Sequence, residues 1–74
     1  MNLFKTKFED LYVADVNLIS DNRGSFGRLF CHEILAPAIK DREILQINFS
    51  LTEKCGSIRG LHFQHPPHSE MKLV

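Results

Sequence analysis

The chain has 74 residues, of which 43% are hydrophobic, with nine basic and nine acidic residues and a formal net charge of zero at pH 7. A chain of this length holds one small domain at most, since it buries only about 60% of its unfolded surface. The balanced charge offers no basic patch for a nucleic acid or an acidic membrane surface, and the hydrophobic content excludes a disordered chain.

The first residues and the cysteines indicate the cellular compartment of the protein. The first residues lack the apolar stretch of a signal peptide, and no run approaches the roughly 20 apolar residues of a membrane span. Cys31 and Cys55 are the only cysteines, without a CxxC spacing, so we expect free thiols rather than a disulfide or a zinc site. The sequence therefore predicts a cytoplasmic protein with no membrane or nucleic-acid partner.

The first third of the chain predicts strands and a turn. Residues 1–10 mix lysines and phenylalanines without a clean period and predict no element. Residues 11–19 are rich in β-formers and predict one strand, with a break near Asp15. The small and polar residues 20–25 predict a turn or loop.

A short strand and the only helix follow. Residues 26–31 predict a strand that presents three alternating side chains on one face: Phe26, Arg28 and Phe30. Residues 32–40 have apolar positions that fit a helical stripe, and Pro37 within them limits the helix to a short or kinked piece. The expected fold class is therefore all-β with one short helix.

Residues 43–52 show the cleanest alternation in the chain. The apolar positions are Leu45, Ile47, Phe49 and Leu51, and the polar positions are Gln46, Asn48, Ser50 and Thr52. This period of two predicts a strand with one buried face. The other face carries neutral hydrogen-bonding groups, which either meet solvent or line a cleft for a sugar or nucleotide.

The next strand is predicted at residues 58–64, after a turn at residues 54–57. Strict alternation places Arg59 on the face opposite His62. Gly60 lies between them and could shift the phase through a β-bulge, so we expect an irregularity at or near this glycine.

The last predicted strand is residues 70–74, preceded by a turn at Pro66 and Pro67. The resulting hairpin carries His62 on its first arm and Lys72 on its second. A neutral imidazole beside an ammonium suits proton abstraction next to a carbonyl, since the histidine takes the proton and the cation stabilises the enolate. These residues can equally be surface charges on a sheet edge.

Three blocks share their order and spacing with a known family. They are Asp21-x-Arg23-Gly24-x-Phe26-x-Arg28-x-Phe30, then Gln46-Ile47-Asn48-Phe49-Ser50, then Arg59-Gly60-Leu61-His62-Phe63-Gln64 followed by Pro66-Pro67-His68-x-Glu70-x-Lys72-Leu73-Val74. From about Val13 to its last residue, the chain resembles the dTDP-4-dehydrorhamnose 3,5-epimerase family. Three blocks in register are more specific than any one of them.

The resemblance implies a substrate and a reaction. The substrate would be a nucleotide-linked 4-keto-6-deoxy sugar, epimerised at C3 and C5 through an enolate without a cofactor, on the route to dTDP-rhamnose and cell-surface polysaccharide. His62 matches the family's general base, and Lys72 matches the cation beside the enolate oxygen.

The resemblance also implies substrate-binding residues. Arg23 matches an arginine that binds the diphosphate, Arg59 another arginine near the sugar, and Gln46 and Asn48 amides that contact the nucleotide or sugar. Arg28 departs from the best-known members, which carry a glutamate that contacts the base. This leaves the identity of the nucleotide open.

The same resemblance implies that residues 1–74 are the N-terminal half of a cupin or jelly-roll domain. The family's acid tyrosine, and the acidic partner of its histidine, belong to the second half, and Tyr12 does not match that tyrosine. We therefore expect no complete double epimerisation from these residues alone. Open strand edges would call for a partner, either a second copy in a homodimer, as in the family, or a missing C-terminal half.

Two other readings stay open. Gly56, His62 and Glu70 resemble part of the cupin metal motif, but Gln64 stands where a second histidine is needed, so we expect no metal site. The chain could also be a non-catalytic remnant or a module that binds a nucleotide sugar.

Overall fold

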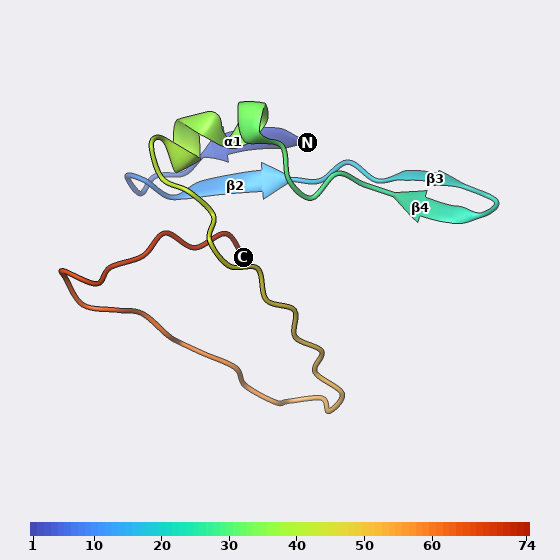
Figure 1. The fold of residues 1–74 in the computed structure, drawn as a ribbon. Coiled ribbons are helices and arrows are strands. Elements are labelled where there is room, and N and C mark those ends of the chain that lie inside the picture. The colour runs from blue at the N-terminus through green and yellow to red at the C-terminus, as the bar shows by residue number, and fades with distance from the viewer. The chain divides into compact units, whose positions relative to one another are not determined.

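The computed structural model describes all residues, 1–74, in two compact units (Figure 1). The N-terminal unit, Met1–Asp41, holds all of the regular structure, and the C-terminal unit, Arg42–Val74, has neither helix nor strand. The elements are β1 (Asn2–Lys5), β2 (Tyr12–Asp15), β3 (Ile19–Asp21), β4 (Gly24–Phe26) and α1 (His32–Ile39). The regular structure is thus mostly β with one short helix, as the sequence predicts.

β1 and β2 form an antiparallel pair, in which Leu3 lies opposite Ala14. Thr6 closes the loop between them: its hydroxyl donates to the Leu11 carbonyl at 2.9 Å and accepts the Phe8 amide at 3.1 Å. The sequence did not predict β1. A short segment of mixed polar and apolar residues becomes a strand only when it pairs with a neighbouring strand, here β2.

β3 and β4 form a second hairpin, which continues the chain beyond β2 in Figure 1. Asp21 pairs with Gly24 across a two-residue turn, which is the turn predicted at residues 20–25. Gly24 has φ +132°, a conformation that favours glycine. The break predicted near Asp15 is confirmed, because β2 ends at that residue.

The strand predicted at residues 26–31 is wrong, since β4 ends at Phe26. At the next residue, a Cβ added to Gly27 would lie 2.5 Å from Cδ2 of Leu18 and 3.0 Å from Cγ1 of Val16. The segments before β3 and after β4 therefore stay close to each other beyond the last backbone pair of the hairpin. There the side chains of Val16 and Leu18 pack against Gly27, and no strands are paired.

α1 supplies the core of the N-terminal unit. Leu35 and Ile39, one helical turn apart, are 2% and 5% exposed, and α1 packs against β1. The helix predicted at residues 32–40 is confirmed, including the proline within it, Pro37. No other side chain of the protein is buried.

The end of α1 is tied to the β1–β2 loop. The Lys40 amide donates to the Ala36 carbonyl at 2.8 Å, and the Lys40 Nζ lies 2.7 Å from Oδ1 of Asp10. Lys40 and Asp10 both have a positive φ, near 60°, so each sits where the backbone reverses. The ion pair joins two reversals that lie 30 residues apart in sequence.

In the C-terminal unit the predicted turns are present and the predicted strands are not. The Ser57 amide donates to the Lys54 carbonyl, and the His68 amide to the His65 carbonyl. The strands predicted at residues 43–52, 58–64 and 70–74 are wrong in this structure, because no segment of the unit forms a ladder. Alternation specifies which face would be buried, but a strand also needs a neighbour for its backbone groups.

The irregularity predicted at Gly60 is confirmed in its position, since this glycine has φ +112°. It is not a β-bulge, because the segment has no ladder for a bulge to interrupt.

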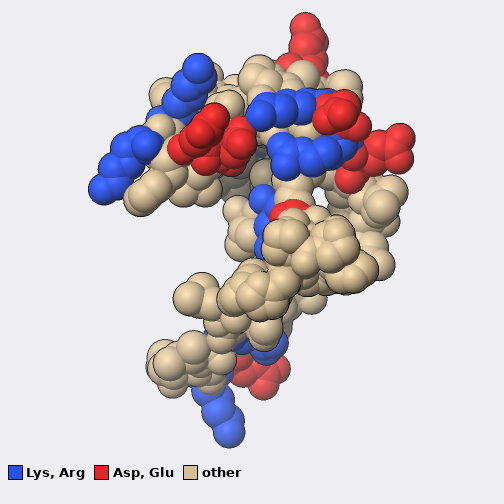
Figure 2. Space-filling model, turned by 90° about the vertical axis from the view of Figure 1, so that its left-hand side faces the viewer, with Lys and Arg blue, Asp and Glu red and all other residues tan.

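No helix of the structure combines the length and apolar character needed to cross a membrane. Lys and Arg side chains are interspersed with Asp and Glu on the face drawn in Figure 2. This mixture of signs agrees with the balanced charge of the sequence.

Candidate functional site

The predicted site residues are divided between the two units. Arg23 and Arg28 belong to the N-terminal unit, and the other five to the C-terminal unit: Gln46, Asn48, Arg59, His62 and Lys72. The site is therefore built from local contacts within each unit.

Lys72 reaches across the turn at Pro66 and Pro67 to the residue predicted as the base. Its Nζ donates to the backbone carbonyl of His62 at 2.7 Å and lies 3.2 Å from Oε1 of Glu70. An ammonium has three N–H donors, so these two contacts leave one for a ligand. The structure thus brings the predicted cation to the backbone of the residue predicted as the base, although their segments form no strands.

The Lys72 contact is open to solvent. The side chains of Lys72 and Glu70 are 42% and 46% exposed, and His62 is exposed as well. An exposed ion pair of this kind is worth little to stability. Its value to a reaction would come from holding the ammonium next to the histidine when a substrate excludes water.

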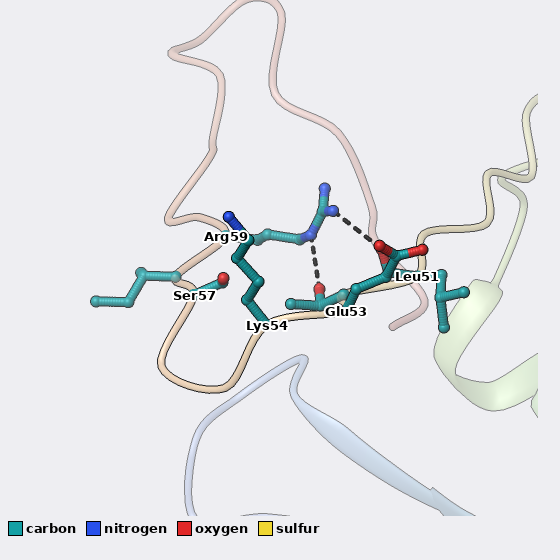
Figure 3. Close-up of a pocket in the computed structure, with 7 residues that line it drawn as sticks. Leu51, Glu53, Lys54, Ser57 and Arg59 are labelled. Carbon is teal, nitrogen blue, oxygen red and sulfur yellow. Dashed lines mark hydrogen bonds between the residues drawn. The ribbon is translucent and has the colours of Figure 1, made fainter.

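Arg59 is held on a different part of the same unit. Its Nε donates to Oγ1 of Thr52 at 2.8 Å, and its Nη2 donates to the Leu51 carbonyl at 3.1 Å (Figure 3). The side chain therefore lies against residues 51–52 and not beside His62. Because residues 58–64 form no strand, strand alternation does not determine which way these two side chains lie.

The Arg59 guanidinium borders a hollow of about 410 Å³. Figure 3 shows Lys54 and Ser57 at the same hollow, on the turn that faces the arginine. Two of the five guanidinium N–H groups are used by Thr52 and Leu51, so the remaining ones are available to an oxyanion or a sugar hydroxyl.

Arg23 forms a two-pronged contact with Asp21 at the β3–β4 turn. Its Nε lies 3.1 Å and its Nη2 2.5 Å from Oδ2, and the backbone amide of Arg23 donates to Oδ1 at 2.8 Å. Hydrogen bonds from the Arg23 side chain, and then from its backbone, lower the pKa of Asp21, and the carboxylate raises the pKa of Arg23. A phosphate that binds Arg23 must share or displace this carboxylate.

The remaining predicted residues lie on the surface of their own units. Arg28 is exposed and follows the end of β4 by two residues. Gln46 and Asn48 are exposed on the segment that forms no ladder.

The sequence did not predict three residues as partners of the site side chains: Asp21, Thr52 and Glu70. Asp21 and Glu70 could have been predicted from their spacing, since each acidic residue lies two positions before the basic residue that it contacts. Thr52 is seven residues from Arg59 and pairs with it only because the chain turns between them.

Neither a metal centre nor a disulfide is present in the two units. No group of three or more His, Cys, Asp or Glu side chains lies together in a way that could hold a metal ion. Cys31 and Cys55 are free thiols, as predicted. A hollow of about 460 Å³ surrounds the β1–β2 loop, and none of the predicted site residues lines it.

The chain is similar to known proteins along nearly its whole length. The profile of the dTDP-4-dehydrorhamnose 3,5-epimerase family matches residues 5–74. A dTDP-4-dehydrorhamnose 3,5-epimerase of Sinorhizobium fredii (strain NBRC 101917 / NGR234) is 38% identical over 72 residues, which cover 90% of this chain and 37% of that protein. No solved structure matches the chain.

Two further relatives carry the same name. The protein of Shigella flexneri is 35% identical over 75 residues, covering all of this chain and 41% of that protein, and the protein of Escherichia coli (strain K12) is 32% identical over 78 residues, covering all of this chain and 40% of that protein. The chain spans about two fifths of the length of these curated relatives. Because the family profile covers nearly every residue, including all seven predicted site positions, the chain belongs to the dTDP-4-dehydrorhamnose 3,5-epimerase family.

Proposed function

We propose that residues 1–74 form the N-terminal half of a cupin-like epimerase domain. The domain acts in the cytoplasm on a nucleotide-linked 4-keto-6-deoxy sugar, inverts C3 and C5, uses no cofactor, and serves dTDP-rhamnose and cell-surface polysaccharide synthesis. The observation that supports this most is the family match over residues 5–74. The contact between Lys72 and the His62 carbonyl gives it a geometric basis.

The chemistry assigns His62 and Lys72 complementary tasks. The C4 ketone acidifies the hydrogens on C3 and C5, and His62 takes one of these protons as general base. The electron pair of the broken C–H bond moves toward the ketone and leaves an enolate oxygen. The Lys72 ammonium, already 2.7 Å from the His62 carbonyl, stabilises that oxygen.

The hydrogen-bond donors of the predicted binding residues determine which part of the substrate each would bind. Arg23 binds the diphosphate by exchanging the Asp21 carboxylate for phosphate oxygens, which its planar fork fits equally well. Arg59 binds near the sugar, and Gln46 and Asn48 bind neutral groups of the sugar or nucleotide. Arg28 contributes to nucleotide choice, where its positive charge favours a different base contact from a glutamate.

A second candidate function is a module that binds a nucleotide sugar without turning it over. The supporting observation is that Tyr12, the only tyrosine, lies in β2 among the backbone pairs of the first hairpin. No tyrosine of these residues then serves as the acid that completes each inversion.

Under the first candidate function, we propose that residues 1–74 alone exchange a substrate proton but do not complete the double epimerisation. We also propose that they associate with a second copy or with a polypeptide that supplies the other half.

The decisive experiment is hydrogen exchange from solvent into the keto sugar. In D₂O with a dTDP-4-keto-6-deoxy sugar, we expect His62→Ala to reduce deuterium incorporation at C3 or C5 about 10²–10⁴-fold, the range for loss of a general base. The matched control is His68→Ala, an exposed histidine beyond the proline turn, which should retain the rate. Equal loss in both variants would overturn the role of His62.

Nucleotide binding separates the two candidate functions from each other. A thermal unfolding scan with and without dTDP should show a transition raised by the nucleotide if either function holds. Exchange that depends on His62 then selects the epimerase, and its absence selects the binding module. A transition indifferent to dTDP would contradict both.

A further inference from the structure

The carboxylate of Glu70 has no task in the proposed function, although it lies next to a residue that has one. Its Oε1 is 3.2 Å from Nζ of Lys72. The same Nζ donates to the His62 carbonyl at 2.7 Å. Glu70 therefore belongs to the immediate surroundings of the ammonium that would stabilise the enolate oxygen.

The turn between His62 and Lys72 produces this arrangement. The His68 amide donates to the His65 carbonyl at 2.8 Å, so the chain reverses around its two adjacent prolines. Lys72 then returns to a carbonyl that lies ten residues earlier in sequence. Glu70 precedes Lys72 by two residues, and in an extended backbone such residues point to the same side. Glu70 can therefore contact the ammonium without any further fold of the chain.

A lysine ammonium needs more than one contact to be held in one place. Its four-carbon stem is flexible, and its three N–H donors rotate about the Cε–Nζ bond. A single acceptor leaves the ammonium free to turn its other donors toward water. With the oxygens of both His62 and Glu70 within 3.2 Å, the ammonium has fewer orientations, and one N–H remains for a substrate oxygen.

Arg59, another cation of this unit, is held in a different way. Its guanidinium donates to the Thr52 hydroxyl at 2.8 Å and to the Leu51 carbonyl at 3.1 Å, and both acceptors are neutral. A planar guanidinium is rigid, so neutral acceptors are enough to orient it, whereas an ammonium on a flexible stem gains from a charged one. The charged contact of Lys72 is thus found where the cation has the greater freedom to lose.

We propose that Glu70 is a positioning residue for the enolate step. Its carboxylate holds the Lys72 ammonium on the His62 carbonyl, and this keeps one N–H available for the oxygen on which the negative charge develops. The inference rests on the proposed function for the reaction that it serves. Glu70 touches no substrate and moves no proton, so it acts only through Lys72. The two side chains are 46% and 42% exposed, and their attraction strengthens when a bound sugar excludes water.

The test is a double-substitution cycle on deuterium exchange from D₂O into a dTDP-4-keto-6-deoxy sugar. We expect Glu70→Ala to lower the exchange rate at saturating sugar about fivefold, the upper range for an exposed ion pair, with KM unchanged because only the enolate is affected. Lys72→Ala should lower the rate about 10²–10³-fold, as loss of a donor to a developing oxyanion does. Adding Glu70→Ala to Lys72→Ala should change nothing further, since Glu70 acts through the lysine.

A matched control separates positioning from a general effect of charge. Glu43→Ala removes another exposed glutamate of the same unit and should keep both the rate and KM. Four results would each overturn the proposal: an unchanged rate with Glu70→Ala, a raised KM with it, an equal loss with Glu43→Ala, or a further loss when Glu70→Ala is added to Lys72→Ala.

An NMR measurement on the free chain tests the contact without any reaction. Relaxation of the Lys72 ammonium nitrogen reports how far its motion is restricted, and the coupling across the hydrogen bond from Nζ to the His62 carbonyl carbon reports the contact itself. We expect Glu70→Ala to increase the motion and weaken the coupling, and Glu43→Ala to change neither. Ammonium motion that is the same with and without Glu70 would overturn the proposal. A chain that restrains the ammonium through Glu70 but exchanges no sugar proton would contradict the proposed function and leave the hold of Glu70 on Lys72 intact.

Discussion

The N-terminal and C-terminal units have different relations between sequence pattern and structure. In Met1–Asp41, two hairpins and a helix form, and Leu35 and Ile39 are buried. In Arg42–Val74, the alternation is cleaner, yet no strand forms and no residue is buried. The unit with the weaker pattern is the one that forms regular secondary structure.

The difference follows from how far each contact reaches along the chain. The β3–β4 turn closes with two residues, and the β1–β2 loop with six, so both hairpins need little loop closure. The helix then covers β1 and supplies the core. In the C-terminal unit, by contrast, the alternating residues 43–52 have no neighbouring strand nearby in sequence, and a regular pattern alone does not form a ladder.

The largest effect should come from removing the core of the N-terminal unit. Leu35→Ala deletes a side chain that is 2% exposed and should lower the free energy of unfolding by about 2–5 kcal/mol, enough to abolish a cooperative transition in so small a unit. The control, Leu45→Ala, should change it by less than about 0.5 kcal/mol, because Leu45 is already 84% exposed. Thermal unfolding followed by circular dichroism measures both, and equal destabilisation would show that Leu45 has a core in the free chain.

A smaller and opposite effect is expected at the proline of α1. Pro37→Ala restores a backbone N–H inside the helix and should raise the free energy of unfolding of the N-terminal unit by about 1–3 kcal/mol. Pro66→Ala makes the same exchange in the C-terminal turn and should leave the transition unchanged. A rise in helical content without a higher midpoint would show that α1 does not limit the stability of this unit.

Much of the N-terminal unit was predictable because its signals are local. The helix at residues 32–40 and the turn at residues 20–25 rest on composition and short spacing, and both are present. β1 was not predictable, because its register with β2 decides that a mixed segment becomes a strand. The strand predicted at residues 26–31 stopped at Phe26 for the same reason, since its partner strand begins at Ile19.

Some contacts of the candidate site residues could also be predicted from the sequence, and others could not. The approach of Lys72 to His62 was predictable, since a turn at Pro66 and Pro67 brings the two arms together even without a ladder. The contact of Arg59 with Thr52 was not, because it depends on the path of the chain through residues 54–57. Sequence patterns thus predicted candidate site residues, and the backbone path showed which of them contact each other within the C-terminal unit.

A hydrogen-bonding threonine occurs in each unit and allows a sharper comparison. Thr6→Val removes the hydroxyl that closes the β1–β2 loop and should lower the free energy of unfolding by about 0.5–1.5 kcal/mol. Thr52→Val removes the acceptor of Arg59 and should not move the unfolding transition, since no residue of that unit is buried. Its effect should appear instead as greater mobility of the Arg59 guanidinium in NMR relaxation. A shift of the midpoint by Thr52→Val as large as that by Thr6→Val would contradict the difference between the units.

The smallest effect concerns the pH dependence of the β3–β4 hairpin. The pKa of Asp21 is lowered in the folded hairpin, chiefly by its hydrogen bonds from Arg23, so the carboxylate stabilises the hairpin above its unfolded pKa of about 3.8. This contribution is lost as the pH falls through the lower folded value. Asp21→Asn keeps an oxygen for the Arg23 amide and removes the charged contact, so the turn should persist while its acid dependence disappears.

An NMR titration of the Arg23 Nε–H resonance would follow this loss. The control, Asp15→Asn, should leave the Arg23 titration unchanged, because Asp15 lies in β2 opposite Asn2. An Arg23 resonance that does not respond between pH 5 and pH 2, around the pKa of a carboxylate, would mean that Asp21 does not hold the guanidinium in solution. Arg23 would then be free to bind phosphate without displacing a carboxylate. The N-terminal unit would in that case expose a candidate binding residue without a partner, whereas the C-terminal unit holds Arg59 through Thr52 and Leu51.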